Sequence, residues 1–372
     1  MRLSYRVPAL ALAAALAAFA PSWARAQAIP QILPQTDPDY PRGRISGLVF
    51  LDYYWNADGD PQHHYGPAGA DTNQVNINGR SNIGEELNGV QIRRVYFQYD
   101  NDLTVKYTTR FRLEVDGRAL DSENKLTVNL KNAYLLVKNV VPRGNFFVGM
   151  LSTPIWENVE GFWKYRSIER TIADFRGIGN ASDMGVELKG FLDDDHRIGY
   201  MAMIGNGTGQ SPETNLFKKG YVSIPLVPIK NLKFEPYWDY MGGPNDLEQN
   251  TYKLFTGYEL NRGAVGFEIV DRLNHSPSGT VEPFGYSLFA RMAPSAKIAA
   301  VARFDHWESN TRSPNRVDSN FYIAGLDWSP TSNVHLMPNV EIMTYDGKGT
   351  AVAPAYTDVQ ARLTFYYSYS KP

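Results

Sequence analysis

Residues 104 to 116 alternate between apolar and charged side chains, and this alternation constrains the fold more than any other feature of the chain. The two sets recur at every second position: Val105, Tyr107, Phe111, Leu113 and Val115 against Lys106, Arg110, Arg112, Glu114 and Asp116. Successive side chains of a β-strand point to opposite faces, so this strand is apolar on one face and charged on the other. Such a long two-faced strand suits a transmembrane barrel that has lipid outside and water inside.

The first 26 residues have the organisation of a secretory signal peptide. Arg2 and Arg6 precede an apolar stretch at 9–20, and Ala24-Arg25-Ala26 supplies small residues for cleavage, with 26–28 as a second option. The apolar stretch is too short to span a bilayer, which takes about 20 residues. We therefore expect an exported chain with a signal peptide at 1–26, a proline-rich periplasmic lead-in at 27–43 and an outer-membrane barrel at 44–372.

Composition excludes several classes of protein. The chain has no cysteine, so it can form neither disulfides nor cysteine-ligated metal sites. Its 23 tyrosines fit the aromatic girdles of a barrel at the two membrane interfaces. Formal net charge is −2, and it becomes more negative once the three arginines of the signal peptide are removed. Without bulk basic character, nucleic acid is not an expected partner.

Sixteen segments carry the strand signal, and the links between them alternate in length. We expect strands at 44–54, 90–99, 104–116, 126–137, 145–151, 183–192, 197–205, 219–226, 231–240, 252–261, 263–271, 283–293, 297–307, 319–328, 334–345 and 357–369, of which 219–226 is the weakest because it contains Pro225. Tight turns on one rim and longer polar loops on the other are typical of bacterial outer-membrane barrels. The sequence thus predicts an all-β fold, a transmembrane antiparallel barrel of sixteen strands. A barrel of this size is too wide for its own side chains to fill, so we expect a pore.

An ordered series of short motifs carries a resemblance to a known family. The segments are 89–94, 109–116, 130–134, 147–154, 167–170, 176–179 and 183–186. In this order they resemble the phosphate-selective porin O and P family of bacterial outer membranes, over about a third of the chain. The resemblance implies a sixteen-stranded, trimeric channel. It also implies a third extracellular loop that folds inward and narrows the lumen.

The link at 152–182 is the third long connection, and it is too apolar for a loop in water. It also carries charges of both signs, and we expect Lys164, Arg166, Glu169, Arg170, Asp174 and Arg176 to form a constriction. The alternative is a loop that packs over the outer rim or against a neighbouring subunit.

Inward-facing cations are the candidates for anion selectivity, and they are Arg94, Lys106, Arg110, Arg112 and Lys131. The face of Arg93 is ambiguous, because the alternation slips between Ile92 and Val95 as a β-bulge would make it slip. Several acids, including Glu114, Glu187 and Glu268, also face inward by parity. Interior salt bridges that only hold the wall together are therefore an open alternative, and phosphate preference is implied by the resemblance alone.

The expected function is passive diffusion of small hydrophilic solutes, in contact with outer-membrane lipid, lipopolysaccharide and small anions such as phosphate, with no cofactor and no bound metal. One alternative is a general, carbohydrate or organic-acid porin, for which Tyr237, Phe289, Trp307 and Tyr345 are the inward aromatics. A barrel enzyme is a remote alternative, because the histidines are scattered and only His63-His64 form a pair. Tyr369 is the expected substitute for a terminal aromatic assembly signal, since the chain ends three residues later.

Overall fold

The computed structural model describes residues 39–61, 84–123, 125–244, 246–353 and 355–371. The chain divides into a unit of residues 1–40, of which only Asp39 and Tyr40 are described, and a unit of residues 41–372. The expected signal peptide and the pair His63-His64 lie outside the described residues. None of the helices in the described ranges is long and apolar enough to cross a membrane.

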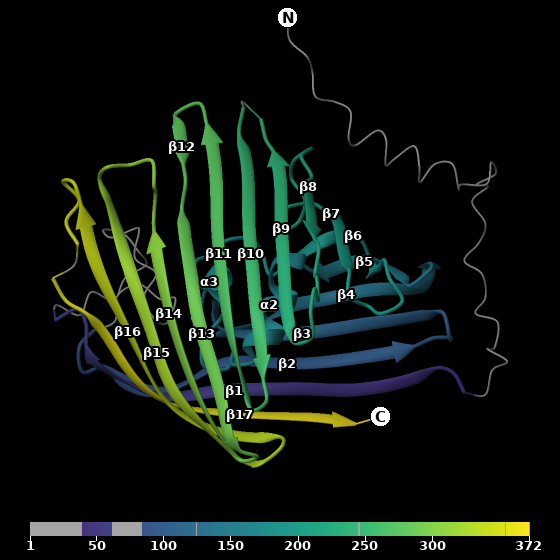
Figure 1. The fold of residues 1–372 in the computed structure, drawn as a ribbon, viewed down its shortest axis with the longest axis horizontal. Coiled ribbons are helices and arrows are strands. Elements are labelled where there is room, and N and C mark those ends of the chain that lie inside the picture. Colours follow the sequence, from purple (N-terminus) through teal and green to yellow (C-terminus); the bar gives the residue numbers. More distant parts are fainter. Residues whose placement is uncertain (1–38, 62–83, 124, 245, 354, 372) are drawn as a thin grey trace, which may run out of the picture. The chain divides into compact units, whose positions relative to one another are not determined.

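The unit of residues 41–372 is a closed antiparallel barrel (Figure 1). Its strands are β1 (Arg42–Asp58), β2 (Asn88–Asp102), β3 (Tyr107–Leu120), β4 (Leu126–Val141), β5 (Gly144–Ser152), β6 (Ser182–Phe191), β7 (Gly199–Gly205), β8 (Lys219–Ser223), β9 (Leu232–Gly242), β10 (Glu248–Leu260), β11 (Gly263–Ser276), β12 (Gly279–Val281), β13 (Phe284–Ser295), β14 (Ile298–Glu308), β15 (Arg316–Thr331), β16 (Val334–Lys348) and β17 (Asp358–Lys371). Consecutive strands pair with one another, except that β12 and β13 both pair with β11, and β1 pairs with both β2 and β17, which closes the ring.

The described residues form a barrel of sixteen strands, as the sequence predicts, once β12 and β13 are counted as one. Both β12 and β13 pair with β11, so they are two pieces of one barrel strand. The interruption falls at Glu282-Pro283, where proline has no N–H to give to a ladder. The Pro283 carbonyl still accepts a hydrogen bond from the Arg272 N–H at 3.1 Å, which keeps the two pieces in line.

All sixteen predicted segments overlap a strand, and two of them need correction. β3 begins at Tyr107 and not at 104, because the Thr104 hydroxyl accepts hydrogen bonds from the N–H groups of Lys106 and Tyr107, both at 3.1 Å, and closes a turn. Lys106 is therefore an exposed turn residue and does not line the barrel. The segment 219–226 shortens to β8, which ends at Ser223, two residues before Pro225.

The two faces of the wall differ in chemistry. Apolar side chains such as Val90 and Leu288 are exposed on the outside, whereas Glu114 and Glu235 are buried on the inside. Exposed aromatics mark both ends of the strands: Trp55, Trp238 and Tyr252 toward the long links, and Tyr99, Trp328 and Tyr369 toward the short turns. An apolar band between two aromatic girdles is what a lipid bilayer selects on the outside of a barrel.

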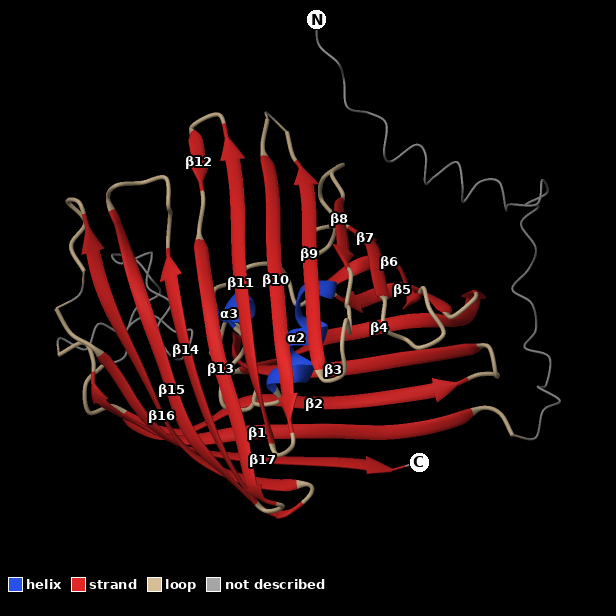
Figure 2. Cartoon of the chain, viewed as in Figure 1, coloured by secondary structure: helices blue, strands red, loops and turns tan. Residues whose placement is uncertain are grey.

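The long link between β5 and β6, residues 153–181, contains the helices α2 (Pro154–Trp163) and α3 (Ile172–Phe175). Both helices lie within the ring of strands (Figure 2). Phe162, Trp163 and Ile168 are completely buried, in one cluster with the wall residues Phe255 and Phe289. The link thus packs against the inner wall of the barrel, and the alternative of a loop over the outer rim does not fit these contacts.

Candidate functional site

Helix α2 presents two different faces to the two halves of the lumen. It starts at Pro154, whose ring suits a first helical turn, and it ends where Lys164 adopts a left-handed φ of 66°. Its buried residues recur at helical spacing: Ile155, Val159, Phe162 and Trp163. Its other face carries Glu157, Glu160, Gly161 and Lys164, which line an open cavity. One amphipathic helix therefore separates a packed half of the lumen from an open half.

In the packed half, cations of the wall hold the backbone of the link. Each donates hydrogen bonds to loop carbonyls: Lys253 to Ile155 at 2.7 Å, Arg291 to Phe162 at 3.3 Å, Arg93 to Ser167 at 3.0 Å and to Ile168, Arg362 to Ile168 at 3.2 Å, and Arg303 to Arg170. These donors come from five different strands (β2, β10, β13, β14 and β17). The loop is thus fixed by charge-assisted bonds along the length of its inward path.

Arg93 reaches the loop because it is the extra residue of a β-bulge. Phe50 pairs with Arg94 and the next residue, Leu51, pairs with Ile92, so Arg93 has no partner of its own in β1. The bulge predicted from the slipped alternation is confirmed. It turns the Arg93 guanidinium toward Glu169 at 3.1 Å and Asp52 at 3.4 Å.

Four of the six residues expected at the constriction belong to the packed half. Glu169 pairs with Arg93 and with Arg170 at 3.2 Å, and Arg170 lies 3.7 Å from Asp174. Burial alone would raise the pKa of the Glu169 carboxyl, but the guanidinium groups of Arg93, Arg170 and Arg362 lower it to about 2. Arg176 lies against the rings of Phe175 and Trp307, at 5.1 and 5.4 Å. These side chains hold the loop together and do not face the open cavity.

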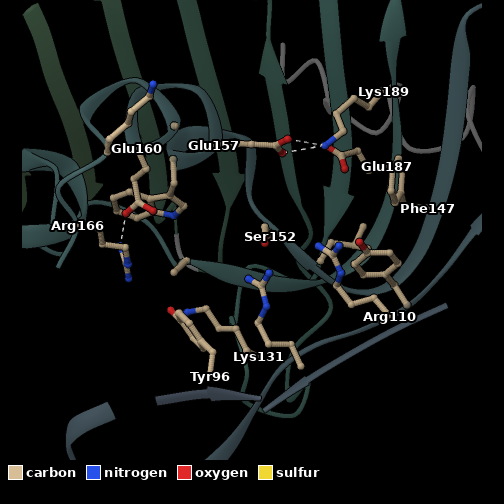
Figure 3. Close-up of a pocket in the computed structure, with 17 residues that line it drawn as sticks. Tyr96, Arg110, Lys131, Phe147, Ser152, Glu157, Glu160, Arg166, Glu187 and Lys189 are labelled. Atoms are coloured by element: carbon tan, nitrogen blue, oxygen red, sulfur yellow. Dashed lines mark hydrogen bonds and ion pairs between the residues drawn. The ribbon is translucent and has the colours of Figure 1, made fainter. Parts of the chain in front are cut away.

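The open half contains a cavity of about 450 Å³ between α2 and strands β2 to β6 (Figure 3). Six cations and three carboxylates line it, namely Arg110, Arg112, Lys131, Lys164, Arg166 and Lys189 against Glu157, Glu160 and Glu187. Aromatic rings complete the wall, with Tyr134 and Phe147 in edge-to-face contact at 5.6 Å. The lining therefore combines charged side chains with aromatic rings, and it is positively charged on balance.

Four of these six cations form ion pairs, and among the described residues Arg112 and Lys164 do not. Arg110 binds Asp100 at 2.6 Å, Lys131 lies 3.2 Å from Glu114, Lys189 lies 2.8 Å from Glu157, and Arg166 pairs with Glu160. Arg112 donates Nε to the side chain of Gln98 at 2.6 Å and lies 5.3 Å from the Tyr96 ring. No carboxylate within the described ranges forms an ion pair with Arg112.

The structure brings together only part of the predicted selectivity set. Arg110, Arg112 and Lys131 line the cavity with the loop residues Lys164 and Arg166. Arg94 does not line the cavity. It is buried and pairs with Glu114 and, at 3.1 Å, with Asp116, which fits the alternative of interior salt bridges that hold the wall together. The prediction missed Lys189 as a site residue, because its inward parity was readable but its closeness to β3 and β4 depends on the curvature of the barrel.

Two other groups of predicted residues occupy structural positions. Tyr237, Phe289 and Trp307 are buried against the loop, so they form no exposed aromatic track for a sugar. His306 contacts Asn320 at 2.8 Å, and His335 contacts Asp327 at 2.9 Å. In the part of the chain that the structure describes, no group of three or more His, Asp or Glu could hold a metal ion.

Comparison with solved structures identifies the fold. The channel DcaP of Acinetobacter baumannii superposes with a TM-score of 0.63 at 10% identity, over 90% of this chain and 99% of that one. OmpT of Vibrio cholerae gives 0.62 at 10% identity (90% and 99%), and an anion-selective porin from Comamonas acidovorans gives 0.61 at 10% identity (89% and 100%). The chain has the fold of outer-membrane porins. No family model and no curated protein sequence matches it.

Proposed function

We propose that this protein is an outer-membrane porin, a passive diffusion channel for small hydrophilic solutes that prefers anions. The observation that carries the preference is Arg112, a lumen cation without a carboxylate partner among the described residues, in a cavity with six cations and three acids. A constriction with an excess of one sign of charge raises the local concentration of the opposite ion. The fold supports the channel, and the cavity supports the sign of its selectivity.

Phosphate is the anion we propose for this site. A guanidinium binds phosphate oxygens in a bidentate fashion and stays charged at every physiological pH. Arg110 and Arg112 lie two residues apart on the same face of β3, with Lys131 of the adjacent strand β4 on the same cavity. The resemblance to the phosphate-selective porin family points to the same ligand.

The same proposal includes the location and assembly of the protein. The apolar band and its aromatic girdles support insertion into the outer membrane among lipid and lipopolysaccharide, after export through a signal peptide at 1–26. We propose a homotrimer, the form in which the structurally similar OmpT of Vibrio cholerae has been solved. The proposal is of a channel and not of an enzyme, and hydrolysis that depends on His306 or His335 would contradict it.

The test is the reversal potential of the reconstituted protein in a planar bilayer across a KCl gradient, followed by titration with phosphate. We expect an anion-selective current that phosphate blocks. Arg112→Gln should lower the permeability of chloride relative to potassium by roughly fivefold, since a unit charge in a wet pore contributes on the order of 1 kcal/mol. Arg312→Gln removes the same charge from an exposed residue paired with Glu282, and it should change nothing. A cation-selective current in the native protein would overturn the proposal.

A further inference from the structure

The open cavity contains a carboxylate without a partner as well as an unpaired cation. Glu187 of β6 lines the cavity and is 4% exposed. Its Oε1 atom is fully buried and has no hydrogen-bond partner. Throughout the described ranges, no group forms a hydrogen bond or ion pair with the Glu187 carboxylate, although the backbone of Glu187 pairs with β5 and β7. A buried carboxylate in this condition is costly unless something else binds it.

The neighbouring cation that could neutralise Glu187 is held elsewhere. Lys189 lies two residues further along β6, on the same face, and its Nζ atom binds both carboxylate oxygens of Glu157 in α2, at 2.9 and 2.8 Å. The pair joins the helix to the wall, as Figure 3 shows. Glu187 is thus left beside a cation that already has two acceptors.

The unpaired groups line one cavity from different strands, Glu187 from β6 and Arg112 from β3. In Figure 3, Glu187, Glu157 and Lys189 lie in the upper part of the view, and Arg110 and Lys131 lie in the lower part. Phe147 lies between Glu187 and Arg110, and its ring meets Tyr134 edge to face. The cavity therefore offers, in order, a carboxylate, an apolar surface and a guanidinium cluster.

We infer that this cavity binds small zwitterions, with the carboxylate of the solute at Arg112 and Arg110 and its ammonium group at Glu187. Amino acids are the solute class that carries both charges on a short apolar body. The inference rests on the proposed function for the arginines that bind the carboxylate of the solute. It adds Glu187 as the group that binds the ammonium of the solute. A channel for simple anions gains nothing from an unpaired carboxylate on the wall of its cavity, because like charge lowers anion occupancy. For a zwitterion the same carboxylate completes the site.

The experiment measures block of the KCl current through the native protein in a planar bilayer at pH 8. The probes are propanoate, a series from glycine through β-alanine and 4-aminobutyrate to 6-aminohexanoate, and the N-acetyl derivative of each amino acid. At least one amino acid should block about tenfold more tightly than propanoate and than its own N-acetyl form, because only it forms a charged hydrogen bond with Glu187. Equal block by all three kinds of probe would overturn the inference without any variant.

The matched variants locate the effect. Glu187→Gln keeps the shape of the side chain and should abolish the tenfold advantage of the amino acid, while block by propanoate is retained or becomes tighter. Glu213→Gln makes the same change at a residue of the link between β7 and β8 that pairs with Lys218, and it should preserve the advantage. An advantage that survives Glu187→Gln would contradict the assignment.

Failure of the inference and failure of the proposed function give different results. If only the zwitterion site is wrong, the native current stays anion-selective, Arg112→Gln still lowers that selectivity, and amino acids block no better than propanoate. If the porin proposal itself is wrong, the native protein shows no anion-selective current, whatever the probe.

Discussion

The two halves of the lumen use the same residue types for opposite purposes. In the packed half, Arg303 and Arg362 are buried and donate to loop carbonyls and acids. In the open half, Arg112 lines a cavity and has no acidic partner among the described residues. The chemistry of an inward arginine therefore says little about its role. What decides the role is whether an apolar surface seals the arginine from water.

Glycines of the wall help to create that seal. A Cβ atom built on Gly257 would lie 2.6 Å from the ring of Phe162, and one on Gly266 would lie 2.4 Å from the ring of Phe289. Because these glycines have no side chain, the aromatic rings can pack directly against the backbone of the sheet. The open half has no comparable filling, because the face of α2 turned toward it carries Glu157, Glu160 and Lys164.

Removing the partition between the halves should have the largest effect. Deletion of residues 158–172 removes most of α2 together with the apolar side chains that fill the packed half. The lumen of a sixteen-stranded barrel is wide without a plug, so single-channel conductance should rise by roughly twofold or more. Deletion of residues 213–216, in the exposed link between β7 and β8, is the control. An unchanged conductance in the 158–172 variant would show that α2 does not limit the current.

A second comparison concerns the stability lost when one phenylalanine of each half is replaced by alanine. Phe162 is completely buried between α2 and the wall, whereas Phe147 lines the cavity. Phe162→Ala should lower the free energy of unfolding by about 3–5 kcal/mol, since a large cavity opens in a dry core. Phe147→Ala should cost less than half of that, because water can fill the space. Denaturant titration followed by tryptophan fluorescence measures both, and equal losses would contradict a dry packed half.

The sequence predicted the wall far better than the contents of the barrel. Period-two alternation predicted the position of all sixteen barrel strands, because lipid and water impose opposite chemistry on the two faces of each strand. Parity also predicted that Arg94 and Arg112 point inward, and it could not tell that Arg94 pairs with Glu114 whereas Arg112 stays unpaired. That distinction depends on which acid lies across the strand and where α2 lies, and both follow from three-dimensional packing.

The link at 152–182 shows the same limit. Its apolar composition correctly indicated burial, and its eight charged residues could not be divided into anchors and lining residues from their order. The division follows from the path of the loop. A helical turn carries Glu160 and Lys164 to one side, and the turn at 165–169 beyond α2 directs Glu169 and Arg170 into the wall network. Helical spacing within 154–163 was the one readable signal, and it required knowing that the segment is a helix.

The smallest effect, and the sharpest contrast between the halves, comes from exchanging one arginine for glutamine in each. Arg291 donates to the Phe162 carbonyl and binds both carboxylate oxygens of Glu259 at 2.9 and 2.8 Å. Arg291→Gln should therefore lower the free energy of unfolding by about 1.5–3 kcal/mol, the range for hydrogen bonds to charged groups, and leave ion selectivity unchanged. Arg112→Gln should lower the anion selectivity and leave the free energy of unfolding nearly unchanged, because it breaks one bond to Gln98 and removes a lumen charge that has no acidic partner among the described residues. Denaturant titration and reversal potentials on both variants decide the matter. If Arg291→Gln shifted selectivity as much as Arg112→Gln does, α2 would not separate two functionally distinct halves.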